Sequence, residues 1–268
     1  MAPNVAPQIQ EDSELIRTDG DGIARLTLNR PTAGNSLSTG LMALLQGELD
    51  NIRSDKNVRV VVIAATGKLF CAGHDLKEIR ANPSRAAYES LFRQCSAMMT
   101  SIVTMPQPVI ARVHGLATAA GCQLVASCDL AVGSTSARFC TPGVDIGLFC
   151  STPMVALSRN VSRKAAMEML LTGQEINSQS AEKFGLINRA VADDALDSTV
   201  DDFCHRIAEK SPLTLAIGKE AFYRQLEMGL EEAYDYASQV MTENMLARDA
   251  EEGIDAFLQK RPPVWQGK

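Results

Sequence analysis

Two short segments could each present a backbone amide to a ligand, because small residues stand directly before the start of an expected helix. In LFCAGHDL, residues 69–76, Gly73 permits a sharp turn, and the amide of His74 then points outward without a partner. In LATAAG, residues 116–121, alanine and glycine let a ligand approach the backbone closely. Two such amides directed at one oxygen would form an oxyanion hole for a carbonyl that gains charge in a transition state. From spacing alone, the favoured interpretation is that Gly73 and Gly121 are turn or close-packing residues.

The segments that must position these amides alternate between strand patterns and helix patterns. The turn sequence DGDG at 19–22 separates two strand patterns, as in a hairpin. Buried strand patterns and amphipathic helix patterns then follow one another toward residue 132. The expected strands are 14–17, 23–29, 58–65, 108–114 and 130–132, and the expected helices are 41–49, 87–105 and 119–128. This order predicts an α/β protein with stacked layers and crossover connections.

After residue 159 the pattern becomes mostly helical. Apolar residues recur at helical spacing in six segments, namely 165–171, 180–184, 196–209, 213–228, 230–246 and 250–259. The last of these have apolar faces that need a partner. We therefore predict a core domain at residues 1–200 and a helical oligomerisation region at 201–268.

Composition and charge exclude several classes of partner. The net charge of −6 is opposite to that of a protein that follows nucleic acid phosphates. The longest apolar run is strand-sized, so no membrane segment is expected. The first residues lack the pattern of a signal or transit peptide, which favours a cytoplasmic protein. The seven cysteines are odd in number and show no metal-binding spacing, so we expect reduced core residues: Cys71, Cys95, Cys122, Cys128, Cys140, Cys150 and Cys204.

A resemblance to a known family rests on five segments in the family's order and spacing. They read NRPTAGNSLS, VVIAATGKLFCAGHDLKEI, PVIARVHGLATAAGCQLVASCDLAV, ARFCTPGVDIGL and EMLLTGQEINSQSAEKFGLINRAV. Together they resemble the enoyl-CoA hydratase/isomerase (crotonase) superfamily over roughly the whole chain. The segments GLATAAGCQLVASCD and GLFCSTP are similar to the sequences of one group within this superfamily.

The resemblance implies a crotonase-like α/β superhelix, a spiral of ββα turns, with a helical C-terminal trimerisation region. It also implies acyl-CoA thioesters as ligands, with coenzyme A entering as part of the substrate and with no separate cofactor or metal. The expected assembly is a homotrimer or a dimer of trimers.

Site residues follow from the same resemblance. The oxyanion-hole amides are those of His74 and Ala120. The channel for coenzyme A is expected along Leu37, Ala72, His74, Asp75 and Leu76, and Phe257 and Lys260 are expected to reach the coenzyme A of a neighbouring subunit. The cations expected near its phosphates are Lys260, Arg261, Lys77 and Arg30.

This sequence departs from the family at the two residues that move protons. Hydratases of the family use two glutamates, which by motif fall on Gln123 and Gly143. A glutamine amide orients water but neither takes nor gives a proton usefully near neutral pH. Each acid or base role is worth about 10²–10⁴-fold in rate, so little two-carboxylate hydration is expected.

No other side chain is an obvious replacement. Asp145 fits a turn or capping carboxylate better than a base, and Ser151 and Thr152 can only position water. The His74 imidazole is a less favoured candidate for catalysis. His114 fits a hydrogen-bonded core histidine and His205 a surface residue. Cys122 and Cys150 have no paired base in the sequence.

Two classes of function therefore remain open, beside a third possibility in which the pocket is closed and the protein acts through its oligomeric surface alone. The favoured one is an enzyme of the crotonase superfamily, nominally an enoyl-CoA hydratase/isomerase, that stabilises a thioester enolate. Thioester hydrolysis or decarboxylation fits Gln123 better than hydration does. The alternative is a non-catalytic acyl-CoA-binding protein.

Overall fold

The described part of the chain starts with a hairpin, as the DGDG turn predicts. The structure is a computed structural model that describes residues 13–268. Strands β1 (Leu15–Gly20) and β2 (Ile23–Leu28) pair antiparallel. Asp21 and Gly22 both have positive φ, 51° and 76°, which is the backbone of a tight hairpin turn.

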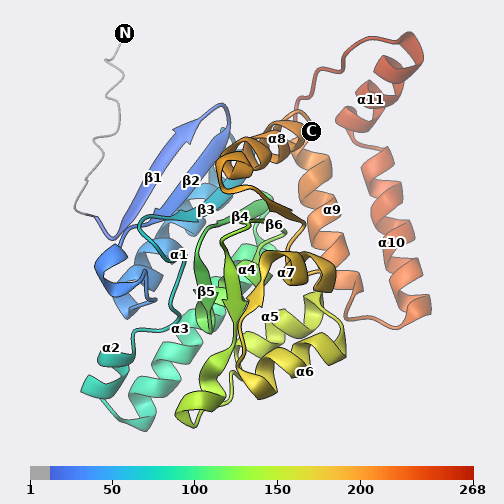
Figure 1. Cartoon of the computed structure of the whole chain (residues 1–268). Coiled ribbons are helices and arrows are strands. Elements are labelled where there is room, and N and C mark those ends of the chain that lie inside the picture. Colours follow the sequence, from blue (N-terminus) through green and yellow to red (C-terminus); the bar gives the residue numbers. More distant parts are fainter. Residues whose placement is uncertain (1–12) are drawn as a thin grey trace.

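A six-stranded sheet forms the centre of the molecule (Figure 1). After β2 the order continues through β3 (Val60–Ala65), β4 (Val109–Val113), β6 (Leu130–Ser134) and β9 (Arg189–Val191), all parallel. All six residues of β3 are buried. A strand covered on both faces explains its uninterrupted apolar sequence.

A second sheet of three strands lies beside the first. It contains β5 (Leu116–Thr118), β7 (Arg138–Cys140) and β8 (Ile176–Asn177). Successive turns of the chain contribute one strand to each sheet, β4 with β5 and then β6 with β7. The α/β superhelix predicted from the sequence is therefore confirmed, and the carboxyl ends of β3 and β4 lead directly into the two amide-presenting segments.

Helices cover the sheets and connect the turns. Helices α1 (Thr39–Ser54) and α3 (Arg85–Thr104) pack together and bury their apolar faces in the main core. Both begin at a serine whose hydroxyl accepts from the helix, Ser38 from Leu41 and Ser84 from Ala87. The remaining helices of this part are α2 (Leu76–Ala81), α4 (Ala120–Ser127), α5 (Pro153–Asn160), α6 (Arg163–Thr172) and α7 (Ser178–Phe184).

Helix α8 (Leu196–Ala208) closes a second, smaller core on the sheet. Its buried residues Leu196, Val200 and Cys204 pack in one cluster with side chains of β3, β4 and β6. The expected division at residue 200 thus lies within α8, since this helix belongs with the sheet. The helices that leave the core begin with α9.

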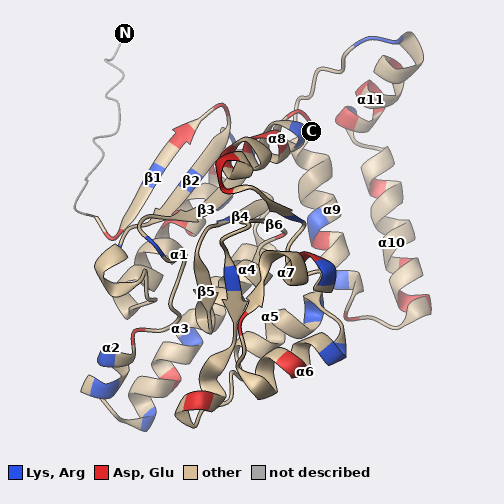
Figure 2. Cartoon of the chain, in the orientation of Figure 1, with Lys and Arg blue, Asp and Glu red and all other residues tan. Residues whose placement is uncertain are grey.

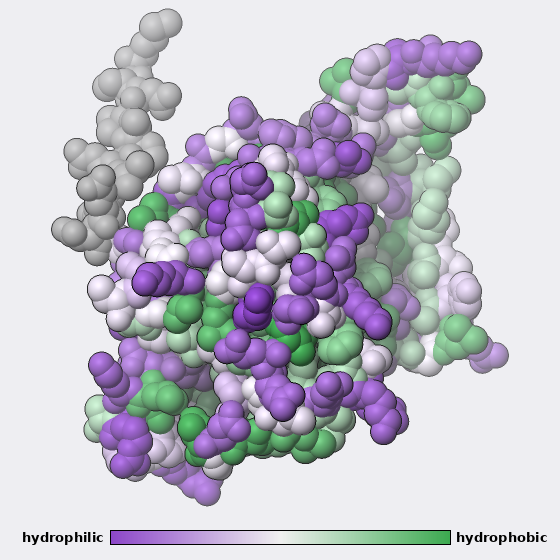
Figure 3. Space-filling model, in the orientation of Figure 1, coloured by the Kyte–Doolittle hydropathy of each residue, from purple (hydrophilic) through white to green (hydrophobic). Residues whose placement is uncertain are grey.

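Three helices extend away from the sheets: α9 (Pro212–Gln225), α10 (Leu230–Met245) and α11 (Arg248–Gln259) (Figure 1). A buried ion pair between Lys219 and Asp129, 2.6 Å apart, fastens α9 to the base of the sheet. Helix α10 contains no buried residue, and apolar atoms follow its length in Figure 3. Its exposed large apolar residues are Leu230, Tyr234, Met241 and Met245.

The segment after α11 folds back to the start of α9. Asp249 is 1% exposed and accepts hydrogen bonds from the Ser211 hydroxyl, 2.5 Å, and from the amides of Gln266, 2.7 Å, and Gly267, 3.0 Å. Trp265 donates its ring N–H to the carbonyl of Glu209, 2.7 Å. These bonds hold residues 265–268 against the core.

The seven cysteines are buried free thiols, as predicted. Within residues 13–268 no helix combines the length and apolar character that a bilayer crossing requires.

Candidate active site

The first amide-presenting segment is held in place by Leu37. The amide of Leu37 donates to the carbonyl of Gly73, 2.7 Å, and the carbonyl of Leu37 accepts from the amide of Asp75, 3.3 Å. In such a parallel bridge the residue between the two partners directs its own amide to the opposite side. The amide of His74 therefore faces away from Leu37, and it has no acceptor among the described residues.

The second segment turns sharply into α4. Ala119 has φ 52° and ψ −117°, a conformation that costs a residue with a Cβ of the order of 1–3 kcal/mol. The Ala119 amide donates to the carbonyl of Cys140, 2.9 Å, which ties this turn to β7. Ala120 is the first residue of α4, and its amide likewise has no acceptor in the described part of the chain.

The two segments meet at Gly73. A Cβ built on Gly73 would lie 2.9 Å from the Ala119 Cβ and 3.3 Å from the Ala120 nitrogen. Gly73 also has φ +85°. A Cβ on Gly121 would lie 2.3 Å from the carbonyl oxygen of Cys71. Both glycines are therefore packing and turn residues, and that packing is what brings the amides of His74 and Ala120 close together.

Gln123 lies one turn into α4 and is 5% exposed. Its Oε1 is buried without a hydrogen-bond partner within residues 13–268. A buried amide oxygen left without a donor is costly, so this atom is available to a donor on a ligand or a water molecule.

The His74 imidazole is half-buried beside the same segment. Its ring meets Phe92 of α3 edge to face, with centroids 5.6 Å apart, and its Nε2 has no partner in the described structure. Burial lowers the pKa of His74, because the charged form is poorly solvated there. The ring is therefore neutral at pH 7.

Gly143, the position of the second expected glutamate, has no room for a side chain. A Cβ there would lie 2.8 Å from the Leu148 carbonyl oxygen and 2.9 Å from the Cys150 Sγ. The Gly143 amide donates to the Cys150 thiol, although burial raises the pKa of that thiol overall. Cys150 thus occupies the space beside position 143 as a thiol, which is the inactive form of cysteine.

The other candidate side chains either form structural hydrogen bonds or are exposed. His114 is held by two hydrogen bonds: Nε2 donates to the Gly67 carbonyl, 2.9 Å, and Nδ1 accepts from Arg112, 3.1 Å. His205 is exposed on α8, as predicted. Asp145 is also exposed and lies near Gly173 at the end of α6. The described residues contain no group of three or more His, Cys, Asp or Glu arranged for a metal ion.

The expected coenzyme A channel is only partly free for a ligand. Asp75 caps α2 by accepting from the amides of Lys77, 3.1 Å, and Glu78, 3.3 Å. Arg30 pairs with Asp75, 3.2 Å, and with Glu14, 2.8 Å. These two residues therefore brace the segment, whereas Lys77 and the half-exposed Leu76 remain open on α2, where basic residues gather in Figure 2.

The remaining expected channel residues fall into two groups, one within the bridged segment and one at the end of α11. Leu37 is fully buried and Ala72 partly buried in the bridged segment. Phe257, 83% exposed, and Lys260 lie at the end of α11, far from α2 within one chain (Figure 1). Arg261 pairs with Glu252, 2.6 Å. The Arg30–Asp75 pair and the Gly143–Cys150 contact were not foreseen, since each joins residues whose proximity depends on the tertiary fold.

Comparison with known proteins agrees with this geometry. The family model described as enoyl-CoA hydratase/isomerase matches residues 18–268. A Xenopus laevis protein named enoyl-CoA hydratase domain-containing protein 3, mitochondrial, is 44% identical over 262 residues, covering 98% of this chain and 89% of its own. The human protein of that name is 46% identical over 245 residues, covering 91% and 81%. This is the group whose sequences the segments GLATAAGCQLVASCD and GLFCSTP resemble.

A solved structure gives the same result for the fold. The enoyl-CoA hydratase of Mycobacterium smegmatis superposes with a TM-score of 0.93 at 52% identity, covering 95% of this chain and 99% of that one. The prediction of a cytoplasmic protein is wrong, since the Xenopus laevis and human relatives are named as mitochondrial. On the family match and these identities, the chain belongs to the enoyl-CoA hydratase/isomerase (crotonase) superfamily.

Proposed function

We propose that this chain binds acyl-CoA thioesters and stabilises the negative charge of a thioester enolate through the amides of His74 and Ala120. The observation that carries the proposal is that both amides lack an acceptor and both lie against Gly73. Amides fixed in this way before the reaction stabilise a developing oxyanion without further reorganisation. Coenzyme A then enters as part of the substrate, with no separate cofactor.

We propose further that the reaction is not two-carboxylate hydration. Gln123 supplies an unpaired amide that can orient water or a substrate carbonyl, and Gly143 supplies no side chain. Thioester cleavage by an oriented water and decarboxylation need mainly enolate or oxyanion stabilisation. These reactions fit the residues better than the addition of water across a double bond.

A second candidate is a non-catalytic acyl-CoA-binding protein. The contact between Gly143 and Cys150 favours it, since the thiol fills the place from which a second catalytic group would act. In both cases the expected assembly is a homotrimer or a dimer of trimers, which α10 and α11 would join, with Phe257 and Lys260 reaching a neighbouring subunit. The names of the vertebrate relatives favour a mitochondrial location.

The test is a panel of enoyl-, 3-oxoacyl- and malonyl-type CoA thioesters in ¹⁸O-labelled water, with products identified by mass spectrometry. Released acid or carbon dioxide is the expected result. Heavy oxygen on the enoyl chain would show hydration and refute the inference from Gln123 and Gly143. Thioesters that are retained but unchanged would favour the binding protein, and thioesters neither changed nor retained would refute both.

Two glycine variants provide matched controls. Gly73→Ala should abolish turnover or binding, because the new Cβ meets Ala119 and the amide of Ala120. Gly47→Ala should leave both unchanged, because nothing lies within 4 Å of a Cβ there.

A further inference from the structure

We propose that a cavity at the amino ends of the central strands, at the end of the sheet opposite to the His74 and Ala120 amides, binds a small organic phosphate. The cavity has a volume of about 510 Å³, within the range of ligand pockets. Arg59 immediately precedes β3 and Pro108 immediately precedes β4, and both line it. The cavity therefore lies at the amino ends of these strands, whereas His74 and Ala120 follow their carboxyl ends.

Four cationic side chains line this cavity on a chain whose net charge is −6: Arg53, Lys56, Arg59 and Lys268. None of the four forms an ion pair within residues 13–268. Arg53 donates to the carbonyl and hydroxyl of Thr104, 3.1 and 3.2 Å, and Arg59 donates to the carbonyl of Lys210. These acceptors are neutral, so within the described residues no carboxylate pairs directly with the cavity cations.

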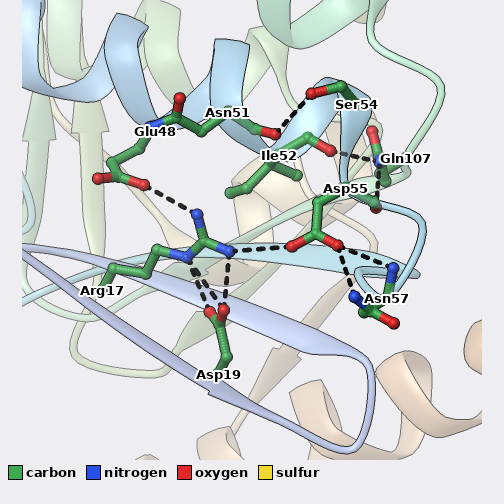
Figure 4. A network of polar contacts seen from close by, with 9 residues as sticks. All are labelled: Arg17, Asp19, Glu48, Asn51, Ile52, Ser54, Asp55, Asn57 and Gln107. Atoms are coloured by element: carbon green, nitrogen blue, oxygen red, sulfur yellow. Dashed lines mark hydrogen bonds and ion pairs between the residues drawn. The ribbon is translucent and has the colours of Figure 1, made fainter. Parts of the chain in front are cut away.

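The single acidic side chain among the lining residues is already occupied. Asp55 accepts from the amide and the side chain of Asn57, 2.9 and 3.0 Å, and lies 3.6 Å from the guanidinium of Arg17. Figure 4 shows Asp55 directed toward Arg17 on β1. Arg17 also pairs with Asp19 and Glu48, so Asp55 is one of three carboxylates around a single guanidinium, and it forms no ion pair with a cavity cation in the described residues.

Two side chains of the lining have a buried polar atom without a partner in the described residues. Gln107 is 8% exposed, and its Nε2 donates to the carbonyl of Ile52, 2.7 Å, while its unpaired Oε1 can accept only from a hydroxyl or amino group on the organic part of the ligand and not from phosphate. The Nε of Arg59 is also buried without an acceptor. At the start of α9 the amide of Leu213 has no acceptor in residues 13–268. Guanidinium groups and a helix amino terminus are together suited to phosphate.

The remaining walls of the cavity are fixed and partly apolar. Trp265 and Gly267 belong to the segment that Asp249 holds against the core, and Trp265 is further bonded to Glu209. Apolar side chains on the other walls are Val58, Pro106, Pro108, Pro212, Leu213 and Leu215. Several cations beside an apolar wall with an indole ring favour a ligand with at least two negative charges and an organic ring, over a monocarboxylate or a bare ion.

The experiment is calorimetric titration of the full chain with adenosine 5′-diphosphate, and with adenosine as the uncharged probe. We expect the diphosphate to bind and adenosine not to bind. Lys56→Gln and Arg59→Gln should each weaken binding at least tenfold, whereas the exposed Arg206→Gln should leave it unchanged. Because Lys56 is exposed and forms no bond within the described structure, its variant tests the cavity even if Arg59→Gln fails to fold.

Saturation with acetyl-CoA separates this cavity from the candidate active site. Binding of the diphosphate should persist when acetyl-CoA is present. The proposal is overturned if the diphosphate does not bind, if the two cavity variants bind it normally, or if acetyl-CoA displaces it while those variants have no effect. None of these results depends on whether the chain turns over a thioester.

Discussion

The Sγ of Cys150 lies 2.9 Å from the point where a Cβ on Gly143 would be, and the Leu148 carbonyl oxygen lies 2.8 Å from the same point. A side chain at position 143 is therefore blocked by a thiol and by backbone. Replacement of the thiol alone would relieve only one of the two contacts. The backbone and side chain of residues 148–150 thus exclude a glutamate at position 143. Restoring it would require a change in this loop as well as a substitution at position 143.

Gly143→Glu is expected to destabilise the protein by about 1–3 kcal/mol, because the new side chain overpacks a buried position. It should not restore hydration. Chemical denaturation and an enoyl-CoA hydration assay measure the two effects. A stable Gly143→Glu variant that hydrates its substrate would contradict the packing argument, and Gly47→Glu, where nothing lies within 4 Å of a Cβ, controls for the added charge.

Gln123→Glu is expected to raise enoyl-CoA hydration at least about tenfold, since one acid or base role is typically worth about 10²–10⁴-fold. Burial should raise the pKa of the new carboxyl above its unfolded value. Its stability contribution is then fully present below the unfolded pKa and is lost as the pH rises, so the variant should be weakest relative to wild type at alkaline pH.

The matched control is Gln46→Glu on α1, where Gln46 Oε1 is also buried without a partner in the described chain. This variant should leave hydration unchanged. An equal rise in both variants would show that the effect at Gln123 is unrelated to the site.

The segment 265–268 should detach when Asp249 loses its charge. Burial alone would raise the pKa of Asp249, but hydrogen bonds from Ser211 and from backbone amides outweigh it and lower the pKa. Its contribution is therefore present above about pH 4, the unfolded value, and is lost as the pH falls further. Trp265 is the only tryptophan, so its fluorescence reports the detachment.

Asp249→Asn should shift Trp265 emission to the red at pH 7 and lower the free energy of unfolding by about 1–3 kcal/mol, since one of the two acceptor oxygens becomes an NH₂ group that cannot accept. Asp255→Asn is a control on the same helix. Unchanged emission in Asp249→Asn would show that other contacts hold the segment.

Stability should fall as the pH drops below about 6.5, in part because His74 has a lowered pKa in the folded state. The unfolded chain then binds a proton that the folded chain does not bind at His74, so the unfolded state is stabilised relative to the folded state. His74→Leu should reduce the difference in unfolding free energy between pH 7.5 and pH 5.5. The exposed His205→Gln variant should retain the wild-type difference.

Met241→Glu should dissociate the proposed trimer, because Met241 is 60% exposed on the apolar stripe of α10. Light scattering after size exclusion measures the molar mass. Thr242→Glu introduces the same charge at the neighbouring position and should remain trimeric. A monomeric wild type would refute the proposed assembly.

The sequence predicted the main elements well where local pattern decides them. The buried β3, the hairpin turn and the helices from α8 to α11 lie close to the expected ranges, because continuous apolar runs and helical spacing are local properties. Gly73 and Gly121 could not be assigned from spacing, since their role depends on Ala119 and Cys71, which approach only in the fold. The Arg30–Asp75 pair and the cationic cavity could not be predicted either, because each joins residues that approach only in the fold.

The bridge between Leu37 and His74 also bears on the order of folding. The two amides are placed by contacts from Leu37 to Gly73, from Gly73 to Ala119, and from Ala119 to Cys140. These contacts join residues far apart in the chain, and closing such loops costs entropy before the contacts form. The strained turn at Ala119 can persist only once β7 is in place. We therefore expect the proposed acyl-CoA site to appear late in refolding, after the hairpin and α1 have formed.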